Sequence, residues 1–209
     1  MKYFKIMLII ATLVAIGLFV KSCSTIKQIS QTLTNLKKLE YKIENVSNFR
    51  VANIDIQKIS SLKDFSITDG LKLANAFGTK KFPADFVLNL NAKNPNNGSN
   101  NTTATSATIA KLDYRLILDD VPTINGDISS PITVPGTGQS VNIPLNMNLD
   151  LYEFFGNRGY EGIVNLALTV GGLNSRPTKV KLDIKPTVNT TFGPISYPSR
   201  ITVIDQEWR

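Results

Sequence analysis

Three aspartates in the middle of the chain are the first candidates for chemistry. Asp119 and Asp120 are adjacent, and Asp127 follows a few residues later. Carboxylates grouped in this way could hold calcium or perform general acid–base catalysis. The ligand spacing of an EF-hand is absent, however, and Asn125-Gly126 predicts a turn between the two groups. We therefore interpret the three aspartates as parts of solvated turns.

Serine and glycine motifs give no stronger indication of catalysis. The chain contains no histidine, which removes the commonest general base, the commonest metal ligand and every Ser-His or Cys-His nucleophile pair. It also lacks a Gly-x-Ser-x-Gly elbow. The stretch VPGTGQSV, residues 134–141, looks like a phosphate-binding loop, but it lacks the Lys-Ser/Thr ending and precedes a predicted strand. The sequence therefore predicts a protein that is not an enzyme and that needs no cofactor or metal.

Cys23 is the one residue for which the sequence predicts a chemical modification. A short basic stretch and an apolar run over residues 6–20 precede it. As a helix this run would span about 22 Å, which is short for the ~30 Å hydrocarbon core of a bilayer and suits a signal peptide. The segment Val20-Lys21-Ser22-Cys23 resembles a bacterial lipobox, in which the cysteine thiolate is alkylated by a diacylglyceryl group. The alternatives are an uncleaved membrane anchor and a lone buried cysteine.

Lipidation at Cys23 would divide the chain into three parts. Residues 1–22 would be a lipoprotein signal peptide, residues 23–38 a tether or short helix, and residues 39–209 the folded domain. Two or three acyl chains on one residue attach a protein stably to a membrane. We therefore expect a bacterial outer-membrane lipoprotein that faces the periplasm. The apolar residues of the tether recur at helical spacing, and this helix could pack on the domain or lie on anionic headgroups.

The net charge of +7 is distributed unevenly along the sequence. Residues 1–81 carry 13 Lys and Arg against 5 Asp and Glu, whereas the remainder carries 10 against 11. Three of the early lysines precede Cys23 and would leave with a signal peptide. Since no dense basic stripe with interleaved aromatic residues remains, nucleic acid is not an expected partner.

Alternating apolar residues predict the elements that would position these groups. From residue 39 onward most apolar residues recur at every second position, which is typical of half-buried strands. The alternating positions are Tyr41 and Ile43; Val51, Ile54 and Ile56; Phe86, Leu88 and Leu90; Leu112, Tyr114, Leu116 and Leu118; Val141, Ile143, Leu145 and Met147; Val180, Leu182 and Ile184; and Ile201 and Val203. About seven short strands separated by Pro, Gly, Asn and Asp indicate a mainly β protein with an antiparallel β-sandwich.

Two helices interrupt this pattern. The first is predicted over residues 68–77, with Thr68 as its N-cap and Gly78 as its stop. The second is predicted over residues 159–170, although the same stretch also alternates and could form a strand.

Four aromatic residues precede or begin the second helix: Tyr152, Phe154, Phe155 and Tyr160. One interpretation is that they pack into the core or under a loop. The other is an apolar groove or patch that takes a lipid, another apolar ligand or a protein partner.

The segment Asn94-Pro95-Asn96 follows one of the predicted strands. Pro95 has no N–H to donate and disfavours a helical conformation at Asn94, so the strand must end here. The residues Asn96-Asn97-Gly98 tolerate positive φ angles and favour a turn.

Several of these segments, in their order, are similar to those of one known family. The ordered set comprises the strand ending at Asn94-Pro95-Asn96, a polar loop, the strand over 109–118, ITVPGTGQSVNIPLNMNL at 132–149 and PTVNTTFGPISYP at 186–198. Together they resemble the late embryogenesis abundant type 2 (LEA-2) family, also described as the water-stress and hypersensitive-response domain, and its lipid-anchored bacterial branch. The resemblance covers about residues 82–200.

The resemblance implies a fold and a role. The fold would be an immunoglobulin-like or fibronectin-III-like sandwich with one or two helices, without a cofactor or enzymatic activity. The role would be stress-linked protection of client proteins or membranes against drying and aggregation. Two competing hypotheses are a periplasmic carrier or sensor of lipid or another apolar ligand, and a structural accessory of an envelope complex.

Overall fold

The computed structural model of the chain describes residues 39–59, 64–95, 97–98, 104–171, 178–190 and 193–208. The predicted signal peptide, the lipid attachment at Cys23, the tether and Asn96 lie outside these residues. No helix within the described part of the chain has the length and apolar character needed to span a bilayer.

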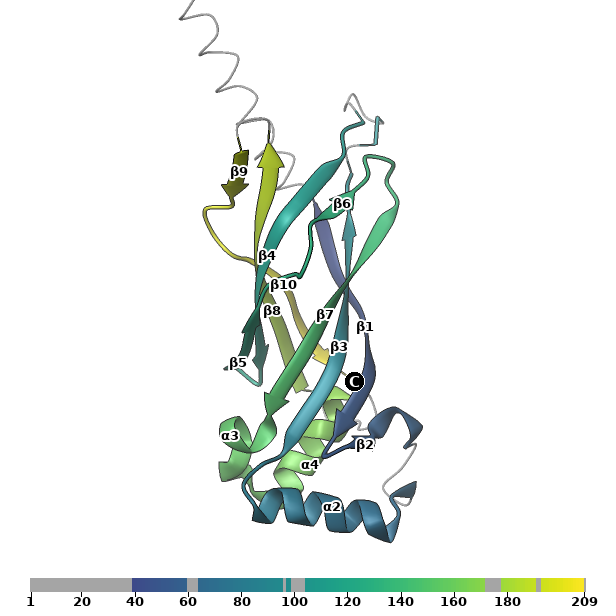
Figure 1. Cartoon of the computed structure of the whole chain (residues 1–209), viewed down its shortest axis with the longest axis vertical. Helices are drawn as coiled ribbons and strands as arrows, with labels where there is room; N and C mark the ends of the chain where they lie inside the picture. The colour runs from purple at the N-terminus through teal and green to yellow at the C-terminus, as the bar shows by residue number, and fades with distance from the viewer. Residues whose placement is uncertain are drawn as a thin grey trace, which may run out of the picture.

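The described chain consists mainly of strands, with short helices inserted among them (Figure 1). The strands are β1 (Glu40–Val51), β2 (Ile54–Asp55), β3 (Pro83–Lys93), β4 (Ala107–Leu118), β5 (Val121–Gly126), β6 (Ile132–Val134), β7 (Ser140–Asp150), β8 (Thr178–Thr190), β9 (Gly193–Ser196) and β10 (Ile201–Trp208). The helices are η1 (Ile56–Lys58), α2 (Ile67–Gly78), α3 (Leu151–Phe155), η3 (Gly156–Arg158) and α4 (Gly159–Val170).

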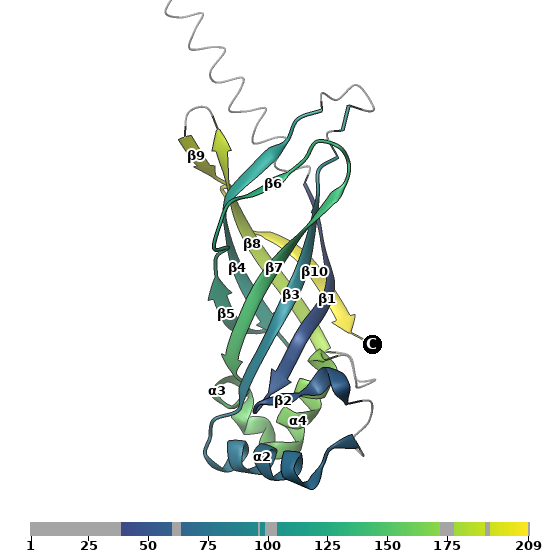
Figure 2. The same ribbon diagram turned by 45° about the vertical axis from the view of Figure 1, so that its right-hand side comes forward.

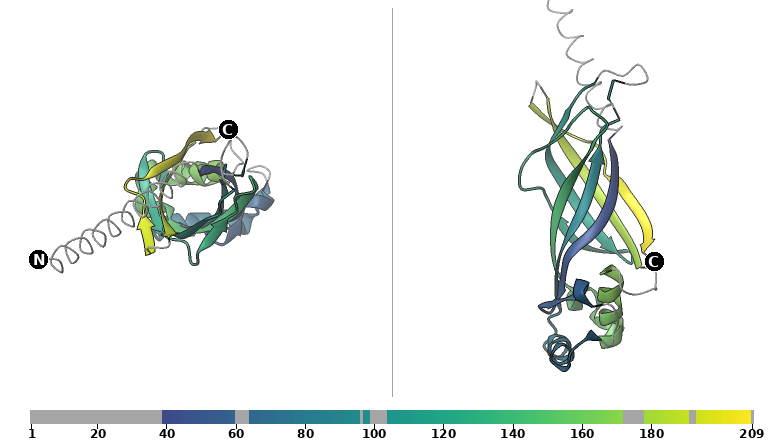
Figure 3. Two further views of the ribbon diagram at one scale, coloured as in Figure 1. Left: turned by 90° about the horizontal axis from the view of Figure 1, so that it is seen from above. Right: turned by 90° about the vertical axis from the view of Figure 1, so that its right-hand side faces the viewer.

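Two antiparallel sheets pack face to face, as the sequence predicted (Figure 2). One sheet has the strand order β2-β1-β3-β7. The other has the order β10-β8-β4-β5, with β6 paired to β4 and β9 paired to β8. β1 contacts β10 and β5 contacts β7, so the sheets also meet along their sides, and the view from above shows a nearly closed ring of strands (Figure 3).

Inward-facing side chains of both sheets fill the space between them. Phe49, Leu88 and Leu116 are among the largest side chains that are almost fully buried. A gap of about 10 Å³ remains between the sheets, lined by Val46, Phe86, Leu88, Leu116, Leu118, Val170 and Val180. A gap of this size has room for about one water molecule, so this part of the interior cannot hold a lipid.

Helices α2, α3 and α4 gather at one end of the sandwich (Figures 1 and 3). The stretch 159–170, for which the sequence left helix and strand open, is helix α4, and most of its second half is buried. Phe77 of α2 contacts Tyr152 of α3 and Tyr160 of α4 in edge-on geometry, with ring centroids 5.4 and 5.7 Å apart. These contacts join α2 to the other helices.

The first predicted helix is present, but its caps differ from the prediction. Thr68 is not the N-cap, because it lies inside the first turn of α2. Ser66 takes that place: its hydroxyl accepts the N–H of Asp69, and the Asp69 carboxylate accepts the N–H of Ser66. Gly78 is the last helical residue, and the left-handed turn follows at Lys80, with φ of 57°.

One strand prediction and one turn prediction require correction. Ile56 does not extend a strand with Val51 and Ile54, because β1 ends at Val51 and a two-residue turn with positive φ angles leads into the short β2. Ile56 then begins the helix η1, whose N-cap Asp55 accepts a backbone N–H and ends the pairing.

The predicted turn at Asn125-Gly126 is also wrong, because both residues belong to β5. The tight turn lies earlier, at Asp119 and Asp120, whose φ angles are 46° and 63°. Two residues with positive φ match the twist of a two-residue hairpin, and aspartate tolerates this conformation.

Candidate functional site: the amide face

The outer face of the β2-β1-β3-β7 sheet carries a group of asparagine side chains, which we call the amide face. Strands β1, β3 and β7 alternate between buried apolar residues and outward polar residues. The antiparallel register aligns the outward residues in rows across the three strands. The amide face consists of Asn45, Asn89, Asn91, Asn142, Asn146 and Asn148. Asparagine has a low strand propensity, so burial of the apolar residues on the inner face must stabilise these strands.

Asn89, on the central strand β3, links all three strands through its side chain. Its Nδ2 donates to Asn45 Oδ1 at 2.7 Å and to Ser47 Oγ at 2.9 Å, both on β1. Its Oδ1 accepts from Asn142 Nδ2 of β7 at 3.1 Å. These bonds hold the amide planes in place, so little side-chain entropy remains to be lost when a ligand binds.

Two further amides of the face bond to acidic side chains of a neighbouring strand. Asn91 Nδ2 donates to Glu44 Oε2 at 2.5 Å, and Asn148 Nδ2 donates to Asp85 Oδ1. In both pairs the carboxylate accepts from the amide nitrogen, so the amide oxygen remains available to another donor.

Irregular pairing of β1 with β3 adds side chains to this face. The register shifts once between Ile43 and Asn45 and again between Ser47 and Arg50. At the second shift Asn48 adopts a left-handed φ of 55°, which asparagine tolerates better than most residues. Gln57 accepts the backbone N–H of Asn48 at 2.7 Å and holds this bulge.

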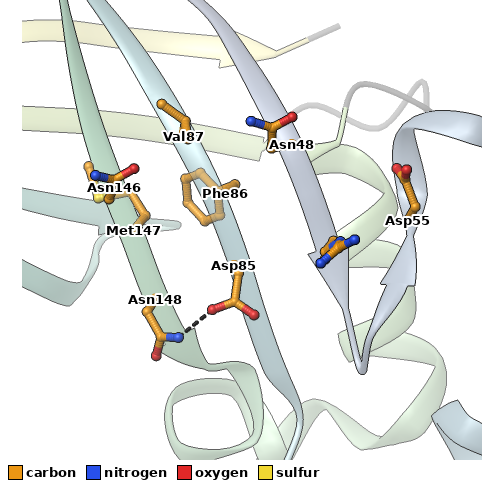
Figure 4. A pocket seen from close by; sticks show the side chains of 9 residues that line it. Asn48, Asp55, Asp85, Phe86, Val87, Asn146, Met147 and Asn148 are labelled. Atoms are coloured by element: carbon orange, nitrogen blue, oxygen red, sulfur yellow. Dashed lines mark hydrogen bonds between the residues drawn. The ribbon is translucent and has the colours of Figure 1, made fainter.

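A shallow hollow of about 530 Å³ lies at one end of the amide face (Figure 4). Its lining residues are Asn48, Arg50, Asp55, Asp85, Phe86, Val87, Asn146, Met147 and Asn148. Within the described part of the chain, the side chains of Asn48, Arg50 and Asn146 make no hydrogen bond or ion pair. The hollow therefore combines one amide that is held by a hydrogen bond, that of Asn148, with three polar side chains whose hydrogen-bonding groups are unused.

Charges on this face balance one another. The outward charged residues of β1 and β3 are Glu40, Lys42, Glu44, Arg50, Asp85 and Lys93, three of each sign. Strand β7 adds no charge between Ser140 and Asn148. On β2, Asp55 lines the hollow and pairs with Lys58 at 3.2 Å, so this charge is also balanced. An electrically neutral face of donors and acceptors suits a neutral polar ligand better than a polyanion.

The opposite outer face, on the β10-β8-β4-β5 sheet, is built from ion pairs. Asp183 accepts from Arg115 Nη2 at 2.7 Å and from Thr202 Oγ1 at 2.9 Å, and Arg200 bonds to Asp113 at 2.7 Å. Burial raises the pKa of Asp183, but the hydrogen bonds from Arg115 and Thr202 outweigh it and hold the pKa below its usual value. The two outer faces of the sandwich thus differ in chemistry.

Asn94 and Pro95 of the predicted family motif lie directly after β3, which ends at Lys93 as expected. The Asn94 side chain is buried, with 1% exposure, and its Nδ2 donates to the carbonyl oxygens of Thr105 at 2.7 Å and Val134 at 3.5 Å. The side chain thus joins the end of β3 to the segment before β4 and to the last residue of β6. Asn94 therefore has a structural role.

The three aspartates do not converge on one site. Asp119 pairs with Arg158 and Asp120 pairs with Lys181, at 2.8 and 2.7 Å. Asp127 accepts two backbone N–H groups and lies beyond the six-residue strand β5, about 20 Å along the chain from the other two. Among the described residues, no group of three or more His, Cys, Asp or Glu could hold a metal ion.

The four aromatic residues at 152–160 have different surroundings. Phe155 is a core residue with 1% exposure, and the Arg158 guanidinium lies 4.6 Å from its ring centroid. Tyr152 and Tyr160 contact α2 through Phe77, and Phe154 is half-buried. Most of this group therefore packs between elements.

A second hollow, of about 430 Å³, lies between α2 and α4. It is lined by Phe65, Gly70, Leu73, Tyr160, Glu161, Val164 and Asn165. Ile67 and Leu71 of α2 are 87% and 67% exposed. Of the predicted apolar patch, Tyr160 alone lines this hollow.

Sequence reasoning missed the amide face, although its signal is visible in the chain. The stretches LNLN at 88–91 and NIPLNMNL at 142–149 alternate asparagine with large apolar residues. The apolar residues of this alternation predict the strands. The asparagines can be assigned to one shared face only when the register of β3 and β7 is known.

Comparisons with known proteins give weak similarities. No family model and no curated protein matches the chain. A crystal structure of a protein from Archaeoglobus fulgidus is 14% identical, with 79% of this chain and 94% of that chain covered and a TM-score of 0.34. A solution structure described as a candidate late embryogenesis abundant protein is 14% identical, with 90% and 87% covered and a TM-score of 0.35. A protein from Arabidopsis thaliana is 14% identical, with 59% and 70% covered and a TM-score of 0.28.

Proposed function

We propose that this chain is a lipid-anchored, noncatalytic protein of the bacterial cell envelope that protects proteins or membranes when water becomes scarce. The observation that carries the proposal is the amide face: a rigid, neutral, solvent-facing array of hydrogen-bond donors and acceptors. When water is withdrawn, polar groups of proteins and headgroups lose their hydrogen-bond partners, and unmade bonds are costly. Amides, which donate and accept at once, can replace those partners.

Three features of the sequence support the proposal. The absence of histidine leaves the chain without the usual general base or nucleophile pair. Cys23 follows an apolar run, in the manner of a lipoprotein. The ordered segments between residues 82 and 200 resemble the late embryogenesis abundant type 2 family, for which a protective role in water stress is expected.

A drying experiment tests the protective role. A model enzyme is dried and rehydrated alone, with the full chain, and with an unrelated β-sandwich protein of equal mass and net charge. We expect the full chain to preserve more enzyme activity and to reduce light scattering more than the unrelated protein does at the same mass concentration. Equal protection by the unrelated protein would contradict the proposal.

A carrier or sensor of an apolar ligand is the second candidate function. It is favoured by the hollow between α2 and α4. Because the gap between the sheets is too small for a lipid, this hollow is the site to test. Titration with a fluorescent fatty acid should then give saturable binding, and replacement of a lining residue, Val164→Lys, should weaken it about tenfold. Binding that is absent, or that is unchanged by this substitution, would remove the candidate.

A further inference from the structure

We infer that the amide face binds a neutral, extended glycan, whose hydroxyl groups bond to the asparagine side chains between β3 and β7. The inference deepens the proposed function and rests on it for the place of action, since it names the class of ligand that this face would meet in an envelope. Hydroxyl groups of a sugar both donate and accept hydrogen bonds, and so do primary amides. The two chemistries are therefore complementary where the asparagine side chains have unused donors and acceptors.

Unused groups around the hollow supply the first argument. Asn48, Arg50 and Asn146 border the hollow from two strands, and within the described residues their side chains bond to no other group of the protein. Asn148 lies in the same row as Asp85, to which its nitrogen donates (Figure 4), and its amide oxygen remains available to a donor of a ligand. A ligand rich in hydroxyl groups could bond to all of these groups without disturbing the fold.

Charge supplies the second argument. The outward charges of β1 and β3 are equal in number and opposite in sign. A polyanion such as a nucleic acid or an acidic glycan would meet as much repulsion as attraction on this surface. A neutral ligand meets neither, and its recognition depends on hydrogen-bond geometry alone.

Repetition supplies the third argument. Outward residues of a strand recur about every 7 Å along its axis, and neighbouring strands lie about 5 Å apart. Along the β3–β7 seam the rows Asn91–Asn142 and Asp85–Asn148 carry two polar side chains each, and the two rows between them carry one asparagine each, Asn89 or Asn146. Because each of these four rows has at least one amide, the seam suits a polymer of similar units that lies along it.

Apolar contacts on this face are few. Between the rows lie Val87, which is half-buried, and the exposed ring of Pro144. The outward positions of β1, β3 and β7 carry no aromatic side chain, since Tyr41 of β1 packs against the core. The C–H faces of pyranose rings would therefore contact Val87 and Pro144, and each sugar unit would bind weakly.

Binding is tested with three soluble probes: cellohexaose, hexa-N-acetylchitohexaose and a heparin oligosaccharide of similar length. The first two are neutral β-linked glycans that represent a plain polysaccharide and an N-acetylated cell-wall chain, and the third is anionic. The full chain is kept in a detergent without a sugar headgroup, and the side-chain amide resonances are followed by NMR. We expect a neutral probe, at millimolar concentration, to shift the resonance of Asn146, with little effect of added salt because no net charge is neutralised.

The variant Asn48→Gly with Asn146→Ala removes two unused amides while glycine keeps the left-handed conformation at position 48. The matched control is Asn75→Ala with Asn157→Ala, which removes two exposed amides from the helical end. We expect about tenfold weaker glycan binding in the face variant and no change in the control. The inference is overturned if neither neutral probe shifts the resonances, if both variants bind alike, or if heparin binds more tightly than the neutral probes.

The same samples are used in the drying experiment, so that the two proposals can fail separately. Protection without glycan binding would remove the inference alone. Salt-independent glycan binding that the face variant loses, without protection of a dried enzyme, would establish the ligand class and remove the protective role.

Discussion

At the scale of single residues, side chains of one type have opposite roles according to their burial. The Asn94 side chain is buried and bonds to backbone carbonyl groups, whereas the Asn146 side chain is exposed and bonds to no group of the described chain. The sequence predicted that Asn94 and Pro95 end a strand, because the missing N–H of proline is a local property. It could not predict that Asn94 is buried, since the carbonyl groups it meets come from distant positions.

Asn94 is expected to be important for stability. Replacement by Ala removes the side-chain donor to a buried carbonyl oxygen, that of Val134, and to the carbonyl oxygen of Thr105, and should lower the free energy of unfolding by about 1–3 kcal/mol. Asn94→Asp should be worse at neutral pH, because a carboxylate would face those oxygens, and should recover in part on acidification. Urea unfolding measures both. Asn75→Ala, an exposed control, should change stability by less than about 0.5 kcal/mol; a loss as small for Asn94→Ala would contradict the assignment.

Asp183 should make stability depend on pH. Its pKa in the folded protein lies below the value of an unfolded chain, so its carboxylate stabilises the fold at pH values above the unfolded pKa and ceases to do so as the pH falls through the folded pKa. Asp183→Asn should therefore cost about 1–2 kcal/mol near neutral pH, and the difference from the parent should shrink below about pH 4.

Thermal unfolding across this pH range measures the difference. Asp113→Asn is a suitable control, because the Asp113 side chain is 47% exposed in its pair with Arg200 and should contribute less. A difference between Asp183→Asn and the parent that stays constant from neutral pH to pH 3 would contradict the role given to the carboxylate.

Among the helices and strands, periodicity predicted most elements, whereas the cap and turn residues inferred from the sequence placed some of their ends wrongly. Alternation predicted β3, β4 and β7 because one face of each is buried. Short strands such as β6 and β9 were missed, since three or four residues carry little periodic signal. Their positions depend on pairing with β4 and β8, which are distant in the sequence.

The start of α2 provides a test at this scale, because sequence and structure name different caps. The capping box assigns the role to Ser66, so Ser66→Ala should destabilise the protein by about 1 kcal/mol. Thr68→Ala should change stability by less than about 0.5 kcal/mol, because Thr68 lies inside the first turn. Chemical denaturation of the two variants measures both effects, and the reverse ranking would restore the cap predicted from sequence.

At the scale of the whole molecule, the sandwich presents three different surfaces: the amide face, the ion-paired face of the other sheet and the helical end. The described chain enters at Leu39, where Glu40 pairs with Lys93, and this is the end of β1 away from the helices (Figure 1). The class of fold was predictable from composition and alternation. The difference between the two outer faces was not, because it depends on which strands share a sheet.

An anchor at Cys23 would join the chain to a membrane through residues that precede Leu39. The helical end would then be the part of the sandwich farthest from that junction, and both outer faces would remain open to the surroundings. The proposed role of the amide face in a cell envelope depends on this anchor.

The measurement that tests the account most directly is the mass of the N-terminal peptide from membrane fractions of cells that express the parent chain or Cys23→Ala. We predict that the parent begins at an acylated Cys23, and that the variant lacks the acyl group and leaves the membrane fraction. An intact Met1 without lipid in the parent would contradict the lipid anchor and the envelope location built on it.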